Sequence, residues 1–147
     1  MITIETMKPE HVSQIAALEK ACFSLPWSER SIASELDNKL SLWLVAMDGQ
    51  TLAGYIGSQT VMGEADMMNV AVESQYRRKG IAEQLVLSLI EALKEKDATQ
   101  LTLEVRASNA PAINLYEKLG FVCVGKRPNY YKNPKEDALI LRKEWVI

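Results

Sequence analysis

The segment from residue 69 to residue 82 constrains the fold of this chain more than any other part of its sequence. Its first four residues, Asn69-Val70-Ala71-Val72, have the β-branched and apolar character of a strand. From Ile81 onward, the apolar residues recur with the period of a helix. The turn between them is basic and ends in a glycine: Arg77, Arg78, Lys79 and Gly80. We therefore predict a strand, a basic turn and a long helix in direct succession.

Three cations at the start of a helix are unusual, because the free N–H groups there already make the local field positive. They are favourable if an anion binds between them, and Gly80 would let the backbone approach such an anion closely. The turn therefore predicts a phosphate-binding site at the N-terminus of the helix. A solvated basic turn is the alternative that the charge run alone allows.

The composition limits the classes of protein to consider. The chain has 147 residues, 48% of them hydrophobic, which fits one domain, residues 1–147, with a substantial core. A net charge of −2 argues against nucleic-acid binding. The sequence has neither a signal-peptide pattern at its start nor an apolar run long enough to cross a bilayer, so we expect a cytoplasmic protein without membrane contact.

The cysteines and the histidine exclude several kinds of catalytic site. Cys22 and Cys123 lie far apart without metal-site spacing, and we expect free core thiols rather than a disulfide. His11 is the single histidine, which argues against catalytic triads and His-based metal clusters. No metal is expected, and the chemistry is left to carboxylates, tyrosines and backbone groups.

Apolar periodicity predicts alternating strands and helices along the rest of the chain. Strands are predicted at residues 2–5, 42–47, 52–61, 65–72, 101–105, 121–125 and 138–142, and helices at 8–22, 29–37, 78–96 and 110–119. Residues 129–134 are predicted to form a polar hairpin end. The strand–helix–strand unit of residues 65–105 is a crossover, so its two strands should be parallel, whereas the first half of the chain should form an antiparallel meander.

Several motifs resemble one known family. Arg77-x-x-Gly80-x-Ala82 after a strand is similar to the acyl-coenzyme A pyrophosphate loop of the GNAT superfamily of N-acetyltransferases, although Ala82 stands where glycine is commoner. Almost the full length resembles one branch, the RimI-type ribosomal protein alanine N-acetyltransferases. The motifs that carry this resemblance are Phe23–Ser28, Asn69–Val72, Arg77–Ala82, Leu103–Asn109, Ala112–Phe121 and Asn129–Tyr131.

The resemblance implies a fold and a reaction. The GNAT fold is an α/β (α+β) architecture with a mixed sheet of about seven strands, an antiparallel N-terminal half and a parallel, splayed pair at strands 4 and 5, flanked by about four helices. The implied reaction moves acetyl from the co-substrate acetyl-coenzyme A directly to the α-amine of a protein N-terminus. The preferred target is an N-terminal alanine, followed by basic residues, in a protein of the small ribosomal subunit.

Residue roles follow from the same resemblance. Glu104 matches the proton acceptor of the family and Tyr116 its proton donor. Tyr130 and Tyr131 resemble residues that line the groove for the substrate peptide. Trp27 fits a core residue between two helices and a wall of such a groove, and both can hold at once. The acetyl-coenzyme A contacts would be Val70, Ala71, Val72, Arg77, Arg78, Lys79, Gly80, Ile81, Ala82, Glu83 and Asn109.

Without the resemblance, the pattern leaves other interpretations of these residues open. Glu104 fits the solvated side of an alternating strand, and Tyr116 fits the apolar stripe of its helix. A carboxylate suits the removal of a proton from an α-amine, whose pKa is about 7.7–8.0. Full proton transfer from a phenol with a pKa of about 10 to a thiolate of about 8.5 is uphill by roughly 2 kcal/mol, unless the site lowers the pKa of the phenol.

Two other functions compete with N-terminal acetylation. A transferase for a small amine, such as a polyamine or an aminoglycoside, would need a closed acidic pocket instead of a groove open at residues 130–131. A non-catalytic coenzyme A-binding module would have no need of both Glu104 and Tyr116. Three acidic residues could meet the basic residues of a peptide: Glu29, Glu35 and Asp37.

Overall fold

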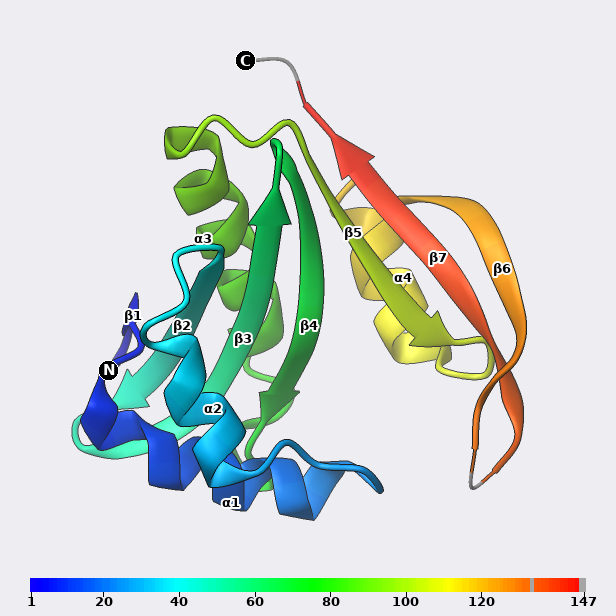
Figure 1. Cartoon of the computed structure of the whole chain (residues 1–147). Helices are drawn as coiled ribbons and strands as arrows, with labels where there is room; N and C mark the ends of the chain where they lie inside the picture. Colours follow the sequence, from blue (N-terminus) through cyan, green and yellow to red (C-terminus); the bar gives the residue numbers. More distant parts are fainter. Residues whose placement is uncertain (133, 146–147) are drawn as a thin grey trace.

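The computed structural model describes residues 1–132 and 134–145 of the chain. These residues contain one mixed sheet of seven strands in the spatial order β1-β2-β3-β4-β5-β7-β6 (Figure 1). The strands are β1 (Ile2–Thr6), β2 (Ser41–Asp48), β3 (Thr51–Val61), β4 (Glu64–Val72), β5 (Gln100–Arg106), β6 (Val122–Tyr131) and β7 (Glu136–Glu144). Neighbours are antiparallel except β4 and β5, which are parallel. The predicted antiparallel first half and parallel central pair are confirmed.

Helices cover both faces of the sheet (Figure 1). They are α1 (Val12–Cys22), α2 (Glu29–Glu35), α3 (Ile81–Glu95) and α4 (Ala110–Lys118). α3 and α4 pack on one face around the larger core, which includes Leu85 and Leu103, and we call this side the α3 face. α1 and α2 pack on the opposite face around Ile15, Ile32 and Tyr55, and we call that side the α1 face. In the described part of the chain, no helix combines the length and the apolar character needed to cross a bilayer.

The two parallel strands separate soon after they pair. β4 and β5 are bonded over three residue pairs, Glu64–Asp66 with Gln100–Thr102. Beyond these pairs β4 continues beside β3 and β5 beside β7, so the two strands diverge (Figure 1). Residues 67–72 of β4 therefore have no paired strand on the side of β5, and their backbone groups on that side are open to other partners. The predicted splay of strands 4 and 5 is confirmed.

A β-bulge interrupts β4 just where it leaves β5. Gly57 of β3 is paired with Asn69, whereas the next residue of β3 is paired with Met67, so Met68 is an additional residue in β4. The partner at the bulge has to be a glycine, because a Cβ on Gly57 would lie 2.5 Å from the ring of Trp43. The glycine thus makes room for an aromatic neighbour.

The bulge reverses which side chains of β4 face which core. Side chains alternate between the faces of a sheet, and one inserted residue shifts that alternation by one step. Ala65 and Met67 pack on the α3 face before the bulge, and Val70 and Val72 pack on the same face after it. Asn69 consequently points to the α1 face, where its side chain meets α1.

Three predicted boundaries are wrong by three residues or more. α1 begins at Val12 instead of residue 8, because Pro9–His11 form a short 3-10 helix. α3 begins at Ile81 instead of residue 78, because Arg78 and Gly80 have φ values of +64° and +75°, which a right-handed helix does not allow. The residues predicted to form a polar hairpin end belong largely to the second half of β6, which continues to Tyr131. Asn133, which was included in that prediction, lies outside the described residues.

The two cysteines are free thiols, as predicted, but the prediction that they are core residues is wrong. Cys22 is half-buried at the end of α1. Cys123 is exposed on β6, which forms an edge of the sheet. A small apolar thiol is therefore found at the surface because its strand has a neighbour on one side only.

Candidate active site

The turn between β4 and α3 presents free backbone donors. The first backbone hydrogen bond of α3 runs from Gln84 N–H to the carbonyl of Gly80, which leaves the N–H groups of Ile81, Ala82 and Glu83 without partners inside the helix. A Cβ on Gly80 would have no atom within 4 Å, so the space beside the turn is open. This geometry fits an anion such as a pyrophosphate.

The basic side chains of this turn lie in two different environments. Arg77 folds back onto the protein, where its Nε donates to the carbonyl of Val72 at 3.2 Å and its guanidinium meets the thiol of Cys22 at 3.7 Å. Arg78 and Lys79 are exposed beside the open turn. Arg77 therefore fastens the turn to the end of β4, and the other two cations remain accessible to a bound anion.

Tyr116 of α4 brings a buried phenol to the edge of β4. Its ring packs edge-to-face on Phe121 with centroids 5.5 Å apart. Its hydroxyl lies 3.9 Å from the sulfur of Met67, the first residue of β4 beyond the pairing with β5. Burial, and to a smaller extent the nearby Tyr131, raises the pKa of Tyr116 to about 12. The hydroxyl is thus protonated at neutral pH and faces a weak thioether acceptor, so it can donate to a better one.

Glu104 lies on β5, two residues beyond the last residue that pairs with β4. Its Oε2 forms an ion pair with Arg127, at 2.9 Å from Nε, and 31% of its side chain is exposed. Leu103 and Val105 pack on the α3 face, so strand alternation turns Glu104 to the α1 face. The carboxylate of Glu104 and the phenol of Tyr116 therefore approach the divergence of β4 and β5 from opposite faces of the sheet.

The end of β6 brings two aromatic rings next to Glu104. Tyr130 and Tyr131 meet edge-to-face at 5.1 Å, and Arg127 lies over the ring of the half-exposed Tyr130 at 5.7 Å. Burial, followed by the negative charge of Glu104, raises the pKa of Tyr131 to about 12. Arg106 stacks over Tyr131 at 4.4 Å and donates to two carbonyls of the loop after β6, at 3.1 and 3.0 Å. Arg106 thereby holds this aromatic pair in place.

Three other predicted site residues make structural contacts of their own. Trp27 packs edge-to-face on Trp43 at 5.4 Å and is half-buried against the α1 face, so it is a core residue with part of its surface exposed. Asn109 caps α4 by accepting a backbone N–H at 3.3 Å. The carboxylate of Glu83 pairs with Lys118 of α4 at 2.8 Å. Each of these side chains therefore has a structural partner outside the pair Glu104 and Tyr116.

The acidic residues considered for a basic peptide differ in accessibility. Glu35 is buried, and its carboxylate accepts hydrogen bonds from four side chains, namely Asn38, Ser41, Trp43 and Gln59. It belongs to the packing of α2 against the sheet and is not available to a peptide. Glu29 and Asp37 are exposed.

Sequence reasoning missed Glu19, which is fully buried on α1. Its carboxylate accepts hydrogen bonds from the N–H of Trp27 and the side-chain amide of Asn69, both at 2.8 Å, and from the hydroxyl of Tyr55. A signal was present in the sequence, because Glu19 follows Ile15 by four residues and therefore lies on the apolar stripe of its helix.

Arg127, which pairs with Glu104, was also missed. It lies in a predominantly polar, exposed part of β6, where a cation has no distinctive pattern. Only the packing of β6, β7 and β5 side by side brings it next to the carboxylate. No local signal in the sequence could have indicated this pair.

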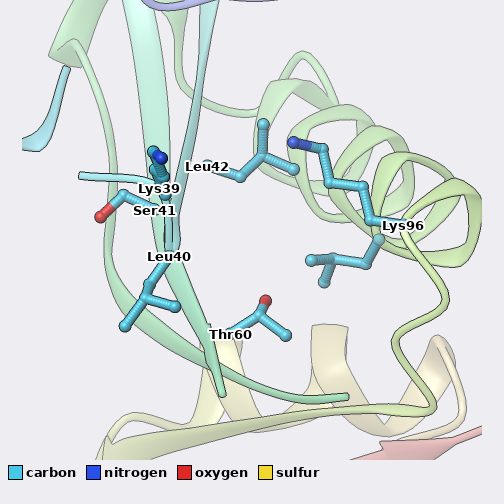
Figure 2. Close-up of a pocket in the computed structure, with 7 residues that line it drawn as sticks. Lys39, Leu40, Ser41, Leu42, Thr60 and Lys96 are labelled. Carbon is cyan, nitrogen blue, oxygen red and sulfur yellow. The ribbon is translucent and has the colours of Figure 1, made fainter. Parts of the chain in front are cut away.

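A shallow, partly open pocket of the structure lies away from these residues. It is lined by residues that include Leu42, Thr60, Leu93 and Lys96, at the opposite end of α3 from Gly80 (Figure 2). The 15 residues of α3 span about 22 Å at the rise of an α-helix. Within the described residues, no group of three His, Cys, Asp or Glu side chains could hold a metal ion. The candidate site is therefore the open region around the divergence of β4 and β5.

The chain belongs to the acetyltransferase (GNAT) family, whose model matches residues 12–121. It is 36% identical, over 143 residues and 96% of both chains, to the ribosomal protein bS18-alanine N-acetyltransferase of Escherichia coli K12. A Bacillus subtilis protein that is provisionally named for the same activity is 40% identical over 144 residues, which cover 97% of this chain and 93% of that one.

A solved structure agrees with these sequence matches. The crystal structure of the ribosomal-protein-S18-alanine N-acetyltransferase from Escherichia coli is similar with a TM-score of 0.91 and 34% identity, covering 100% of this chain and 96% of that chain. The predicted GNAT fold and the resemblance to RimI-type enzymes are therefore confirmed. Enzymes of this family use acetyl-coenzyme A.

Proposed function

We propose that this chain acetylates the N-terminal alanine of ribosomal protein bS18, with acetyl-coenzyme A as the acetyl donor and without a metal. The observation that carries the proposal is 36–40% identity, over nearly the whole chain, to relatives that bear the name of this activity. We further propose that residues 1–147 act as one domain. Because ribosomal proteins are the targets, the reaction belongs to the cytoplasm.

The β4–α3 turn would hold the pyrophosphate of the donor. The free N–H groups of Ile81, Ala82 and Glu83 would bind its oxygens, with Arg78 and Lys79 supplying positive charge and Gly80 permitting the close approach. Arg77 contributes indirectly, because it fastens the turn to the end of β4. The side-chain oxygen of Asn109 caps α4, so only its side-chain amide nitrogen is left to contact acetyl-coenzyme A.

The unpaired edge of β4 would hold the acetyl thioester, which is the reacting part of acetyl-coenzyme A. Acetyl-coenzyme A supplies the acetyl group as a thioester, and backbone N–H groups of Val70–Val72 on the open edge would bind its carbonyl oxygen. Glu104 would take the proton from the α-amine on the α1 face. Tyr116 would donate a hydrogen bond to the departing sulfur from the α3 face. Attack and departure thus occur on opposite sides of the reacting carbon, which suits a direct transfer without an acyl-enzyme.

The shape of the surface near β6 supports a peptide substrate. Tyr130 is 49% exposed, and the half of β6 that precedes it is exposed as well. An extended N-terminus could lie along Tyr130, Tyr131 and the exposed part of Trp27 on its way to Glu104. A small polyamine or aminoglycoside would instead require an enclosed acidic pocket. A non-catalytic module would have no reason to present both Glu104 and Tyr116 at the divergence of β4 and β5.

The test compares two basic peptides, one with a free N-terminal alanine and one with a blocked N-terminus and internal lysines. With acetyl-coenzyme A and wild-type protein, mass spectrometry should show one acetyl group on the first peptide and none on the second. Glu104→Gln should lower the rate by about 10²–10⁴-fold, the usual contribution of a general base. Glu91→Gln is the matched control, because it removes an exposed, ion-paired carboxylate on α3.

The outcomes separate the competing functions. Acetylation of both peptides would indicate a lysine-directed or broad enzyme. Acetylation of neither peptide, while coenzyme A still binds, would refute the ribosomal-protein proposal and favour a small amine or a non-catalytic role. An unchanged rate in Glu104→Gln would contradict the role of this carboxylate and leave the substrate assignment intact.

A further inference from the structure

Glu19 joins three separate parts of the chain through one buried carboxylate. Its Oε1 accepts the backbone N–H of Trp27, in the connection between α1 and α2, at 2.8 Å. Its Oε2 accepts the side-chain amide of Asn69 on β4 at 2.8 Å and the hydroxyl of Tyr55 on β3. Glu19 has no exposed surface, and these three donors are neutral. Neutral hydrogen bonds therefore hold a carboxylate inside the protein.

A carboxylate is a costly choice for this position if packing is its purpose. Burial of a charged group is unfavourable unless it is fully hydrogen-bonded, and an apolar residue of similar volume often gives a more stable core. The neighbours of Glu19 on the stripe, Ile15 and Leu18, are apolar and fully or nearly fully buried. What distinguishes Glu19 from them is the set of groups that it holds in place.

The bond to Asn69 depends on the bulge in β4. If Met68 were instead paired as a regular residue of β4, the alternation along β4 would place Asn69 on the α3 face, and Val70 and Val72 would point away from the core that they now fill. Asn69 can reach Glu19 in the bulged register alone. The bond between Asn69 and Glu19 thus favours this register over the regular one.

We propose that Glu19 is a positioning residue that fixes the bulged register of β4 relative to the connection between α1 and α2. The inference rests on the proposed function. In that function, β4 carries the backbone donors of Val70–Val72, and the connection between α1 and α2 carries Trp27. One carboxylate would then set the distance between the edge that holds the acetyl group and the surface along which the peptide arrives. A change at Glu19 should affect the transfer step far more than the binding of the donor's phosphates, which lie at another turn.

Glu35 provides a matched control for this proposal. It is also a buried carboxylate with several neutral donors, and it also packs a helix against the sheet. Its partners lie on β2 and β3 or directly after α2, and none of them lies on β4. Glu35→Gln therefore carries a similar structural burden without disturbing the register of β4.

The experiment compares Glu19→Gln, Asn69→Ala, the double variant and Glu35→Gln in the full-length protein. In Glu19→Gln one side of the group becomes an amide donor that faces other donors. Asn69→Ala leaves the backbone of β4 intact and removes only its link to Glu19. Steady-state kinetics with the alanine peptide, calorimetric titration with acetyl-coenzyme A, and amide hydrogen exchange are measured at a temperature where each variant is folded.

We expect Glu19→Gln and Asn69→Ala each to lower kcat by on the order of 10- to 100-fold, since small misplacements of reacting groups have effects of this size. The dissociation constant for acetyl-coenzyme A should change by less than about threefold, because the β4–α3 turn is untouched. The double variant should be no slower than the slower single variant, because both changes break the same link. Amide exchange at residues 69–72 should increase in Asn69→Ala and stay unchanged in Glu35→Gln.

Several results would overturn the inference. They are an equal loss of kcat in Glu19→Gln and Glu35→Gln, multiplied losses in the double variant, or unchanged exchange at residues 69–72 in Asn69→Ala. If Glu19→Gln does not fold, Asn69→Ala alone decides through its exchange pattern. A wild-type protein that acetylates no alanine peptide would refute the proposed function, and the exchange measurement would still decide the role of Glu19.

Discussion

Tyr116→Phe offers a sharp separation of function from stability in this protein. The substitution removes one hydroxyl and keeps the ring that packs on Phe121. The partner of this hydroxyl is the sulfur of Met67 at 3.9 Å, which is a weak acceptor. We therefore expect the free energy of unfolding to change by less than about 1 kcal/mol. Tyr116→Ala would be a poor test, because loss of a buried ring costs about 3–5 kcal/mol.

The effect on catalysis can be estimated from the pKa of about 12 that burial gives to Tyr116. Against a thiol with a pKa of about 8.5, full transfer of the phenol proton would be uphill by about 5 kcal/mol. The structure therefore contradicts the condition that the site lowers the pKa of this phenol, and it favours a strong hydrogen bond to the departing sulfur. A hydrogen bond to a charged group contributes about 1.5–3 kcal/mol, so kcat should fall by about 10- to 150-fold.

The assay is single-turnover acetylation of the alanine peptide with protein and acetyl-coenzyme A preformed as a complex, followed from pH 6 to pH 10. A pKa raised to about 12 keeps the phenol neutral over this whole range. Loss of the phenol proton should thus not slow the wild-type reaction at alkaline pH. We therefore expect no alkaline decline in the wild-type rate that disappears in Tyr116→Phe. Such a decline near pH 8–9, or a rate unchanged by the substitution in a stably folded variant, would refute the reasoning.

Three further predictions concern the surroundings of the site. Arg127→Gln removes an exposed ion pair worth about 0.2–1 kcal/mol. The incoming amine then no longer has to displace a cation from Glu104, so the KM for the peptide should fall by up to about fivefold. A higher KM would contradict this. Gly57→Ala forces a Cβ into the ring of Trp43 and should lower the free energy of unfolding by about 1–3 kcal/mol in urea denaturation, a loss that stability equal to wild type would exclude. Burial alone would raise the pKa of Glu35, but its four side-chain hydrogen bonds lower it below 4.5 overall, so Glu35 stabilises the fold above pH 4.5 and this contribution is lost as the pH falls through its lowered pKa. Unfolding curves of Glu35→Gln should therefore depend less on pH below 4.5 than those of wild type, and equal slopes would argue against the assignment.

The order and type of the elements could be predicted because the sequence carries strong local signals for them. The basic turn before Ile81, the helical stripe after it and the alternating strand around Glu104 each specify local structure without reference to the rest of the chain. The start of α3 was placed three residues too early for a physical reason. Arg78 adopts a left-handed conformation that non-glycine residues seldom take, and its residue type does not predict this conformation.

The assembly of the candidate site could be predicted only in part. The resemblance to a known family, and not the local pattern, identified Glu104 and Tyr116 as candidates. Their arrangement on opposite faces of the sheet follows from the alternation of side chains along β5 and from the packing of α4. The pairing of Arg127 with Glu104 requires the strand order β5-β7-β6, which is a property of the whole sheet. Contacts of this kind join residues far apart in sequence, so periodicity within a window cannot reveal them.

The bulge at Met68 explains how one short strand serves both faces of the sheet. In a regular strand, residues that fill the α3 core before and after the divergence would have to keep one unbroken alternation, and Asn69 would then face that core as an amide without a partner. The added residue lets Val70 and Val72 remain in the core while Asn69 turns to Glu19 on the other side. The strand can therefore leave β5 without losing either layer of packing.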